Sequence, residues 1–173
     1  MTLRYLPEHA DAARLALDLA EREALYLAYS HRTLFSLPID LPWVEALPGR
    51  DDLAEKIDAF LSRFARLQDH IGDKLLSSFA RLLGEGPKSL LDVLAYAERM
   101  EWVASAEAFI GARRLRNLLV HEYMTNAALF LEALQAADSA TRMLLSIVGR
   151  LRQQALQLGL PVADGKDRAG PRG

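Results

Sequence analysis

The side chains best suited to chemistry gather in one short segment, RRLRNLLVHEY, at residues 113–123. If this segment is helical, with about 100° per residue, four of its polar side chains fall within an arc of about 140°. Three leucines then face the opposite side, where a core is expected. Arg116 and Tyr123 are seven residues apart and return to nearly the same side. The four polar side chains are those of Arg113, Arg116, Asn117 and His121, and the leucines are Leu115, Leu118 and Leu119.

Such a set suits the cleavage of a phosphodiester bond in RNA. Histidine is the residue type that most readily exchanges a proton near neutral pH, and His121 can carry a proton to or from the 2'-hydroxyl or the leaving oxygen. Arg116 keeps its charge, and its fork matches phosphate oxygens as negative charge builds, while Asn117 can orient the phosphate or the imidazole. Because the 2'-hydroxyl is the nucleophile, this scheme needs no metal and no cofactor, and it predicts RNA rather than DNA as substrate.

A single copy of the chain offers one histidine in this set. An acid and a base act together more easily if two copies of the helix meet across a two-fold axis, so we expect a homodimer. The spacing alone also fits an ordinary solvated face of an amphipathic helix. Two details favour a site: His121 lies near the expected helix end, where its ring can turn toward Arg116, and RRLR forms a local basic patch in a chain of formal net charge -2.

Several enzyme classes lack their signatures here. There is no glycine-rich phosphate loop, no HExxH and no nucleophile elbow, and no histidine follows a glutamate by three residues. The chain has no cysteine, which excludes disulfides and thiolate chemistry and suits a reducing cytoplasm. Asp69 and Asp73 are four residues apart and could hold a hard cation, but solvated or paired surface acids explain that spacing better.

The elements that must position these residues are predicted to be helices. Apolar residues recur at spacings of three and four, without a period of two. Helices are expected at about 8–37, 51–83, 89–100 and 105–123, and from Thr125 or Asn126 to about 158. The connector at 37–49 holds three prolines, and Trp43 is expected to anchor it to the core. The apolar side of the first helix is expected to comprise Leu15, Leu19, Tyr26 and Leu27.

Long helices joined by short breaks predict an all-α fold, an antiparallel up-and-down bundle of four to five helices. The length suits a single domain, residues 1–160, followed by a disordered tail at 161–173. No apolar run approaches the roughly 18 residues that cross a bilayer, so no membrane partner is expected.

The motif at Arg116, Asn117, His121 and Tyr123 resembles the R-x4-H-x-Y form of the HEPN superfamily. This longer form is similar to that of HepT-like toxins encoded beside a minimal nucleotidyltransferase antitoxin. RFARLQDHIGDKLLSSF, at residues 63–79, also resembles the second helix of that group.

The resemblance implies a HEPN-like, usually dimeric bundle in which two motifs meet at a cleft between protomers. It implies a metal-independent ribonuclease acting on an RNA such as tRNA or mRNA, with Arg116 and His121 as the catalytic pair and Asp69 as a supporting residue. The partner nucleotidyltransferase would silence the toxin by adding AMP to Tyr123, because phosphate placed beside Arg116 would block the RNA phosphate site.

Two other interpretations stay open. In the first, the bundle is a binding module that docks the nucleotidyltransferase and has little or no nuclease activity; Tyr123 is then a modification or docking point. In the second, the chain is a structural or regulatory bundle whose motif is accidental.

Overall fold

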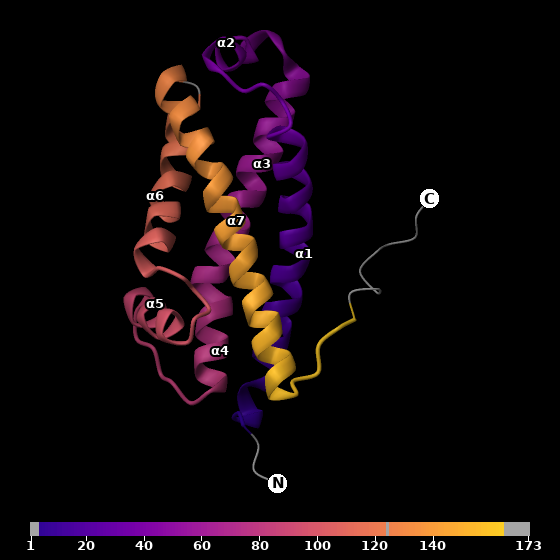
Figure 1. Ribbon diagram of the computed structural model, residues 1–173, viewed down its shortest axis with the longest axis vertical. Helices are drawn as coiled ribbons and strands as arrows, with labels where there is room; N and C mark the ends of the chain where they lie inside the picture. Colours follow the sequence, from indigo (N-terminus) through magenta and orange to yellow (C-terminus); the bar gives the residue numbers. More distant parts are fainter. Residues whose placement is uncertain (1–3, 124, 165–173) are drawn as a thin grey trace.

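Long helices lie side by side along one axis in the computed structural model, which describes residues 4–123 and 125–164 (Figure 1). The helices are α1 (Ala10–Leu34), α2 (Leu41–Glu45), α3 (Asp51–His70), α4 (Leu76–Leu82), α5 (Leu90–Arg99), α6 (Ala106–Glu122) and α7 (Ala127–Leu158). A π-helical turn, Ile71–Leu75, joins α3 to α4, and 3-10 turns cover Pro7–His9 and Leu47–Gly49. No strand occurs in the described ranges, and the predicted all-α bundle is confirmed.

Four long rods form the bundle and alternate in direction. α1 runs one way, the α3–α4 rod returns, α6 runs parallel to α1, and α7 returns beside them (Figure 1). α1 packs against α3 and α7, and α6 packs against the same two helices. α1 and α6 therefore occupy diagonal corners of the bundle, and their outer faces look in different directions.

Side-chain caps set several helix starts where the sequence predicts them. The Ser89 hydroxyl accepts a hydrogen bond from the Asp92 N–H at 3.1 Å, and the Asn126 side chain accepts one from the Leu129 N–H at 3.0 Å. Each cap satisfies a backbone donor that the first turn leaves free. At the other end of α7, Gly159 takes a left-handed conformation at φ 73°, which glycine adopts without a steric cost.

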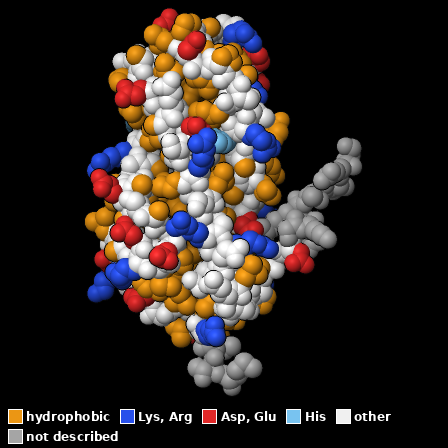
Figure 2. All heavy atoms as spheres, viewed as in Figure 1, with side chains coloured by type: hydrophobic (Ala, Val, Ile, Leu, Met, Phe, Trp, Pro, Cys, Tyr) orange, Lys and Arg blue, Asp and Glu red, His pale blue; other side chains and the backbone are white. Residues whose placement is uncertain are grey.

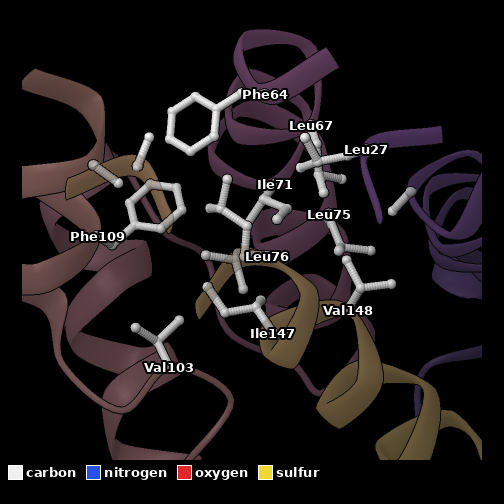
Figure 3. Packing of buried hydrophobic residues seen from close by; sticks show 14 of the residues in the cluster. Leu27, Phe64, Leu67, Ile71, Leu75, Leu76, Val103, Phe109, Ile147 and Val148 are labelled. Atoms are coloured by element: carbon white, nitrogen blue, oxygen red, sulfur yellow. The ribbon is translucent and has the colours of Figure 1, made fainter. Parts of the chain in front are cut away.

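The core follows the buried ridge of the α3–α4 rod. Phe60, Phe64, Leu67, Ile71 and Leu75 are all fully buried along it. Figure 3 shows how this ridge meets the side chains that the other helices contribute. Those partners include Leu27, Val103, Phe109, Ile147 and Val148.

The expected apolar side of α1 is wrong in all but one residue. Leu27 is buried, but Leu15, Leu19 and Tyr26 are 71%, 46% and 60% exposed. The face that enters the core instead combines small and large side chains: Ala13, Ala16, Leu17, Ala20, Leu27 and Leu34. Because alanines let neighbouring backbones approach closely, this face packs against both α3 and α7, while Leu15, Leu19 and Tyr26 remain on the outside.

The proline-containing connector also differs from the prediction, since it contains the short helix α2. Asp40 caps this helix by accepting a hydrogen bond from the Trp43 N–H at 2.8 Å, and Pro42 lies in its first turn, where proline is tolerated. Trp43 is half-buried and packs against the core.

Beyond α7, the chain runs back along the bundle. Leu160 is buried, Val162 packs on the core, and an Arg152 Nη2 group donates to the Ala163 carbonyl at 3.3 Å. Residues 165–173, the rest of the predicted tail, lie outside the described residues. Among the helices that are described, none combines the length and apolar character needed to cross a bilayer.

Burial on α5 gives a matched pair of leucines for testing the packing. Leu94 is fully buried, whereas Leu91, one turn earlier, is 65% exposed. We expect Leu94→Ala to lower the free energy of unfolding by about 2–5 kcal/mol and Leu91→Ala to lower it by less than about 0.5 kcal/mol. Urea titration followed by circular dichroism measures both. Equal losses in the two variants would contradict this packing of α5.

Candidate functional site

The helix that carries the motif is fixed at its start by two polar contacts. The Ser105 hydroxyl accepts from the Ala108 N–H at 3.1 Å, and a Glu98 carboxylate oxygen accepts from the Ala106 N–H at 2.6 Å. Negative charge at a helix N-terminus is stabilised by the helix dipole. α6 then begins at a defined residue, which sets the direction in which every later side chain points.

One face of α6 enters the core. Phe109, Ala112 and Leu119 are buried and Leu115 is half-buried, but Leu118 is 38% exposed. The prediction that all three leucines near the motif face the core is therefore wrong for Leu118. The reason is that α6 contacts α3 and α7 over only part of its circumference, and Leu118 lies outside that part.

The π-helical turn holds α6 close to α3 near the motif. Gly72, within this turn, lies against the Phe109 ring, and a Cβ atom added at Gly72 would come within 3.4 Å of it. Such a contact is tighter than usual, so glycine lets the two helices approach. Phe109 and Gly72 lie two helical turns and one turn from Arg116 and Asp69, respectively, so this contact joins α6 to the α3–α4 rod close to the two charged residues. π turns within helices are frequent at functional sites.

Arg116 joins the two helices through an ion pair. Its Nη2 group donates to an Asp69 carboxylate oxygen at 3.3 Å, and its Nη1 group donates to the Asn117 side-chain oxygen at 3.2 Å. The side chains of Arg116 and Asp69 are 36% and 42% exposed. The Arg116 Nε group is buried and finds no acceptor in the described part of the chain. Three of the predicted site residues thus form one partly exposed cluster.

His121 does not join this cluster within one protomer. α6 stays regular through Glu122, so His121 is turned by about 140° from Arg116, as five residues of helix require. Its ring is exposed, and no side-chain hydrogen bond of His121 is found among the described residues. Arg113, one turn before Arg116, is half-buried. From the sequence we expect the His121 ring to leave the helical path and reach Arg116. No contact between the two side chains supports this expectation.

Tyr123 points toward the start of α3. Its hydroxyl donates to the Ala54 carbonyl at 3.5 Å, and its ring packs on Phe130 with 5.0 Å between centroids. Burial raises the pKa of the Tyr123 phenol, and the negative charge of Asp58 raises it further. Tyr123 also lines an open groove of about 490 Å³ between the connector, the start of α3 and the α6–α7 turn.

The other histidines lie away from the motif. His70 follows Asp69 in sequence, but its Nε2 atom is 2.8 Å from the Ala16 carbonyl, on the α1 side of the rod. His31 lies 2.6 Å from an Asp138 carboxylate oxygen, and the second oxygen of Asp138 accepts from Arg142 at 3.2 Å. The sequence gives no signal for this polar group, because His31 and Asp138 are 107 residues apart. The contact between His31 and Asp138 bridges α1 and α7.

Comparisons with models of protein families, with curated proteins and with solved structures find no match to this chain. Within the described ranges, no group of three or more histidine, aspartate or glutamate side chains is placed to hold a metal ion. Any assignment of function therefore depends on the motif and its geometry.

The environment of Tyr123 predicts a late ionisation. We expect its phenol to titrate above the ordinary value of 10.0, because burial and Asp58 both disfavour the phenolate. The difference in phenolate absorbance between the wild type and Tyr123→Phe, followed against pH, isolates this group from the other tyrosines. Because the folded state holds the proton more tightly, the contribution of Tyr123 to stability is present below pH 10 and lost above it. A difference signal that titrates at or below pH 10 would contradict this burial.

Proposed function

We propose that this protein is a metal-independent endoribonuclease of the HEPN type, the toxin of a toxin–antitoxin pair, with Arg116 and His121 as its catalytic residues. The observation that carries the proposal is the cluster of Arg116, Asp69 and Asn117 on the α3–α6 surface, beside an exposed His121. A fixed cation and a titratable imidazole on one helix are the groups that RNA cleavage by its own 2'-hydroxyl requires.

Arg116 is placed to receive a phosphate. The Arg116 side chain is 36% exposed, and that of its partner Asp69 is 42% exposed. An exposed ion pair of this kind contributes only about 0–1 kcal/mol, so an RNA phosphate can replace the carboxylate at small cost. Asp69 then acts as a positioning residue, because it keeps the guanidinium against α3 until substrate binds. Asn117 holds a second edge of the same guanidinium.

His121 completes the site from a second protomer in this proposal. The rotation along α6 separates it from Arg116 of its own chain, whereas a two-fold axis beside α6 brings each His121 toward the partner's Arg116. Val120, which is 56% exposed and lies between Arg116 and His121 around α6, gives this surface apolar area for such a contact. The cleavage site is then composite, with one catalytic group from each copy.

Tyr123 is the proposed point of regulation by a partner nucleotidyltransferase. Its phenol oxygen would attack the α-phosphorus of ATP, forming the ester bond to AMP and releasing pyrophosphate, while a base on the partner takes the phenolic proton. Tyr123 and Arg116 lie two turns apart on nearly the same side of α6. The Tyr123 hydroxyl points to the Ala54 carbonyl, 15 residues along α3 from the Asp69 that pairs with Arg116. In this proposal the modified side chain turns away from Ala54, so that its phosphate competes with RNA phosphates for the guanidinium. The cytoplasm, where both RNA and ATP are present, is the proposed site of action.

Substitution of the proposed pair tests the activity directly. We expect Arg116→Ala and His121→Ala each to lower RNA cleavage at least about 100-fold, because each removes a group that acts in the transition state. The assay follows purified protein with total tRNA and an mRNA transcript in the presence of EDTA. Arg81→Ala, which removes an exposed arginine on α4 outside the motif, is the matched control and should keep near wild-type activity. Folded wild-type protein that leaves both RNAs intact would overturn the proposal.

Mixing two inactive variants tests whether the site is composite. A heterodimer of Arg116→Ala with His121→Ala retains one complete site, made from the intact Arg116 of one copy and the intact His121 of the other. We therefore expect the mixture, unfolded and refolded together, to regain up to about one-quarter of wild-type activity, since half of the dimers carry one working site. Activity that stays at the level of the separate variants would place both groups in one chain.

A second candidate function is a binding module that docks the nucleotidyltransferase without cleaving RNA. The specific observation in its favour is the arrangement within one protomer, where Asp69 occupies Arg116 and His121 stands apart. In this case the wild type and both alanine variants leave RNA equally intact, while Tyr123 still accepts AMP from its partner enzyme.

A further inference from the structure

A glutamine on α3 lies in the core without a hydrogen-bond partner. The Gln68 side chain is completely buried, and neither its Oε1 nor its Nε2 atom has a partner among the described residues. A buried amide without hydrogen bonds destabilises the folded state, whereas an apolar side chain of the same shape does not. Polar groups that break this rule are expected at functional sites.

Two contacts between α3 and α6 define the surroundings of Gln68. Asp69 pairs with Arg116, and Gly72 lies against the Phe109 ring. Gln68 is the residue before Asp69 and lies one turn before Gly72, so it faces α6 from the buried side of the same contact. It therefore lies opposite the α6 segment between Phe109 and Arg116.

The Arg116 side chain extends toward the same buried region. Side chains on a helix lean back toward its N-terminus, so Arg116 leans over Ala112, which is buried and small. The Nη1 and Nη2 groups of Arg116 donate to Asn117 and Asp69. Its Nε group is buried and has no acceptor in the described part of the chain. A buried donor and a buried amide are thus both unsatisfied in one contact between α3 and α6.

We propose that Gln68 is a positioning residue for Arg116, whose Nε group donates to the Gln68 Oε1 atom when a phosphate takes the place of Asp69. This role rests on the proposed function of Arg116 as a phosphate ligand. In the structure, the two Nη contacts hold the guanidinium in an orientation that leaves Nε without an acceptor. Release of Asp69 frees the guanidinium to turn, and one new hydrogen bond then satisfies two buried groups. Both Nη groups become available to the phosphate, in the forked geometry that arginine uses for such anions.

The overall charge of the protein gives a bound phosphate little general attraction. The formal net charge is -2, and Figure 2 shows basic and acidic side chains interspersed over the described part of the face that α7 forms. The affinity for a phosphate then depends on how well single cations are directed toward it. A residue that directs Arg116 is therefore expected to change this affinity without touching the phosphate.

Gln68→Met tests this role, because methionine keeps the length of the side chain and removes the amide. We expect a melting temperature at least about 2 °C higher, since two unsatisfied buried atoms are lost. We also expect at least about tenfold weaker binding of a labelled single-stranded DNA oligonucleotide, since Arg116 loses its buried acceptor. The probe lacks the 2'-hydroxyl and is not cleaved. Circular dichroism follows melting, and fluorescence anisotropy follows binding.

Thr141→Val is the matched control. Thr141 is also completely buried with an unpartnered hydroxyl, but it lies on α7, outside the contact between α3 and α6. We expect this variant to raise the melting temperature and to leave the affinity for the oligonucleotide unchanged.

Two further variants separate positioning from a general structural effect. Gln68→Glu keeps an oxygen acceptor and should retain most of the affinity that Gln68→Met loses. In an Arg116→Lys background, which has no Nε group, Gln68→Met should no longer change the affinity. The Arg116 Nε–H signal in an NMR spectrum should shift when inorganic phosphate is added to the wild type, and should stay unchanged in Gln68→Met.

Several results would overturn the role of Gln68. They are a lower melting temperature in folded Gln68→Met, affinity equal to that of the wild type, the same loss in the Arg116→Lys background, or a wild-type Nε–H signal that ignores phosphate. These readouts do not require cleavage. Wild-type protein that binds the oligonucleotide through Arg116 and leaves RNA intact would contradict the proposed ribonuclease and still support this role.

Discussion

Burial of the ridge along the α3–α4 rod is the constraint on which the rest of the structure depends. Phe60, Phe64, Leu67, Ile71 and Leu75 are fully buried in one line, and α1 and α6 pack along its two sides. α7 then fills the remaining corner between α1 and α6. The burial of this many large side chains supplies the main driving force for folding, and it also determines which faces of α1 and α6 remain for contact with other molecules.

The π-helical turn keeps this ridge continuous. One extra residue per turn rotates the following helix, so that Leu75 and Leu76 are both buried and Phe79 stays on the core side. The same turn places Gly72 under the Phe109 ring. Packing thus links the sequence to the site. The turn adjusts α4 to the core, and Gly72 leaves room for the Phe109 ring of α6. On the same side of the rod, Asp69 pairs with Arg116.

The sequence predicts helix boundaries well because local chemistry sets them. Ser89 and Asn126 cap helices through their own side chains, and the left-handed glycines Gly84 and Gly159 follow the ends of α4 and α7. The sequence predicts the faces of α1 poorly, because that helix has apolar residues on two sides and only the neighbouring helices decide which side is buried. The π turn and α2 leave no clear periodic signal. The pairing of Asp69 with Arg116 needs the approach of two helices that are distant in sequence, so only the motif suggests it.

The polar cluster on α6 is separate from the forces that hold the bundle together. Arg116, Asp69 and Asn117 are partly or largely exposed, and an exposed ion pair contributes little to stability. The core contacts of α6 are made by Phe109, Ala112 and Leu119 instead. Chemistry at the surface of α6 can therefore change without loss of the fold. By the same reasoning, the exposed pair of Arg116 and Asp69 does not determine how α3 and α6 pack, because the buried side chains between the helices do.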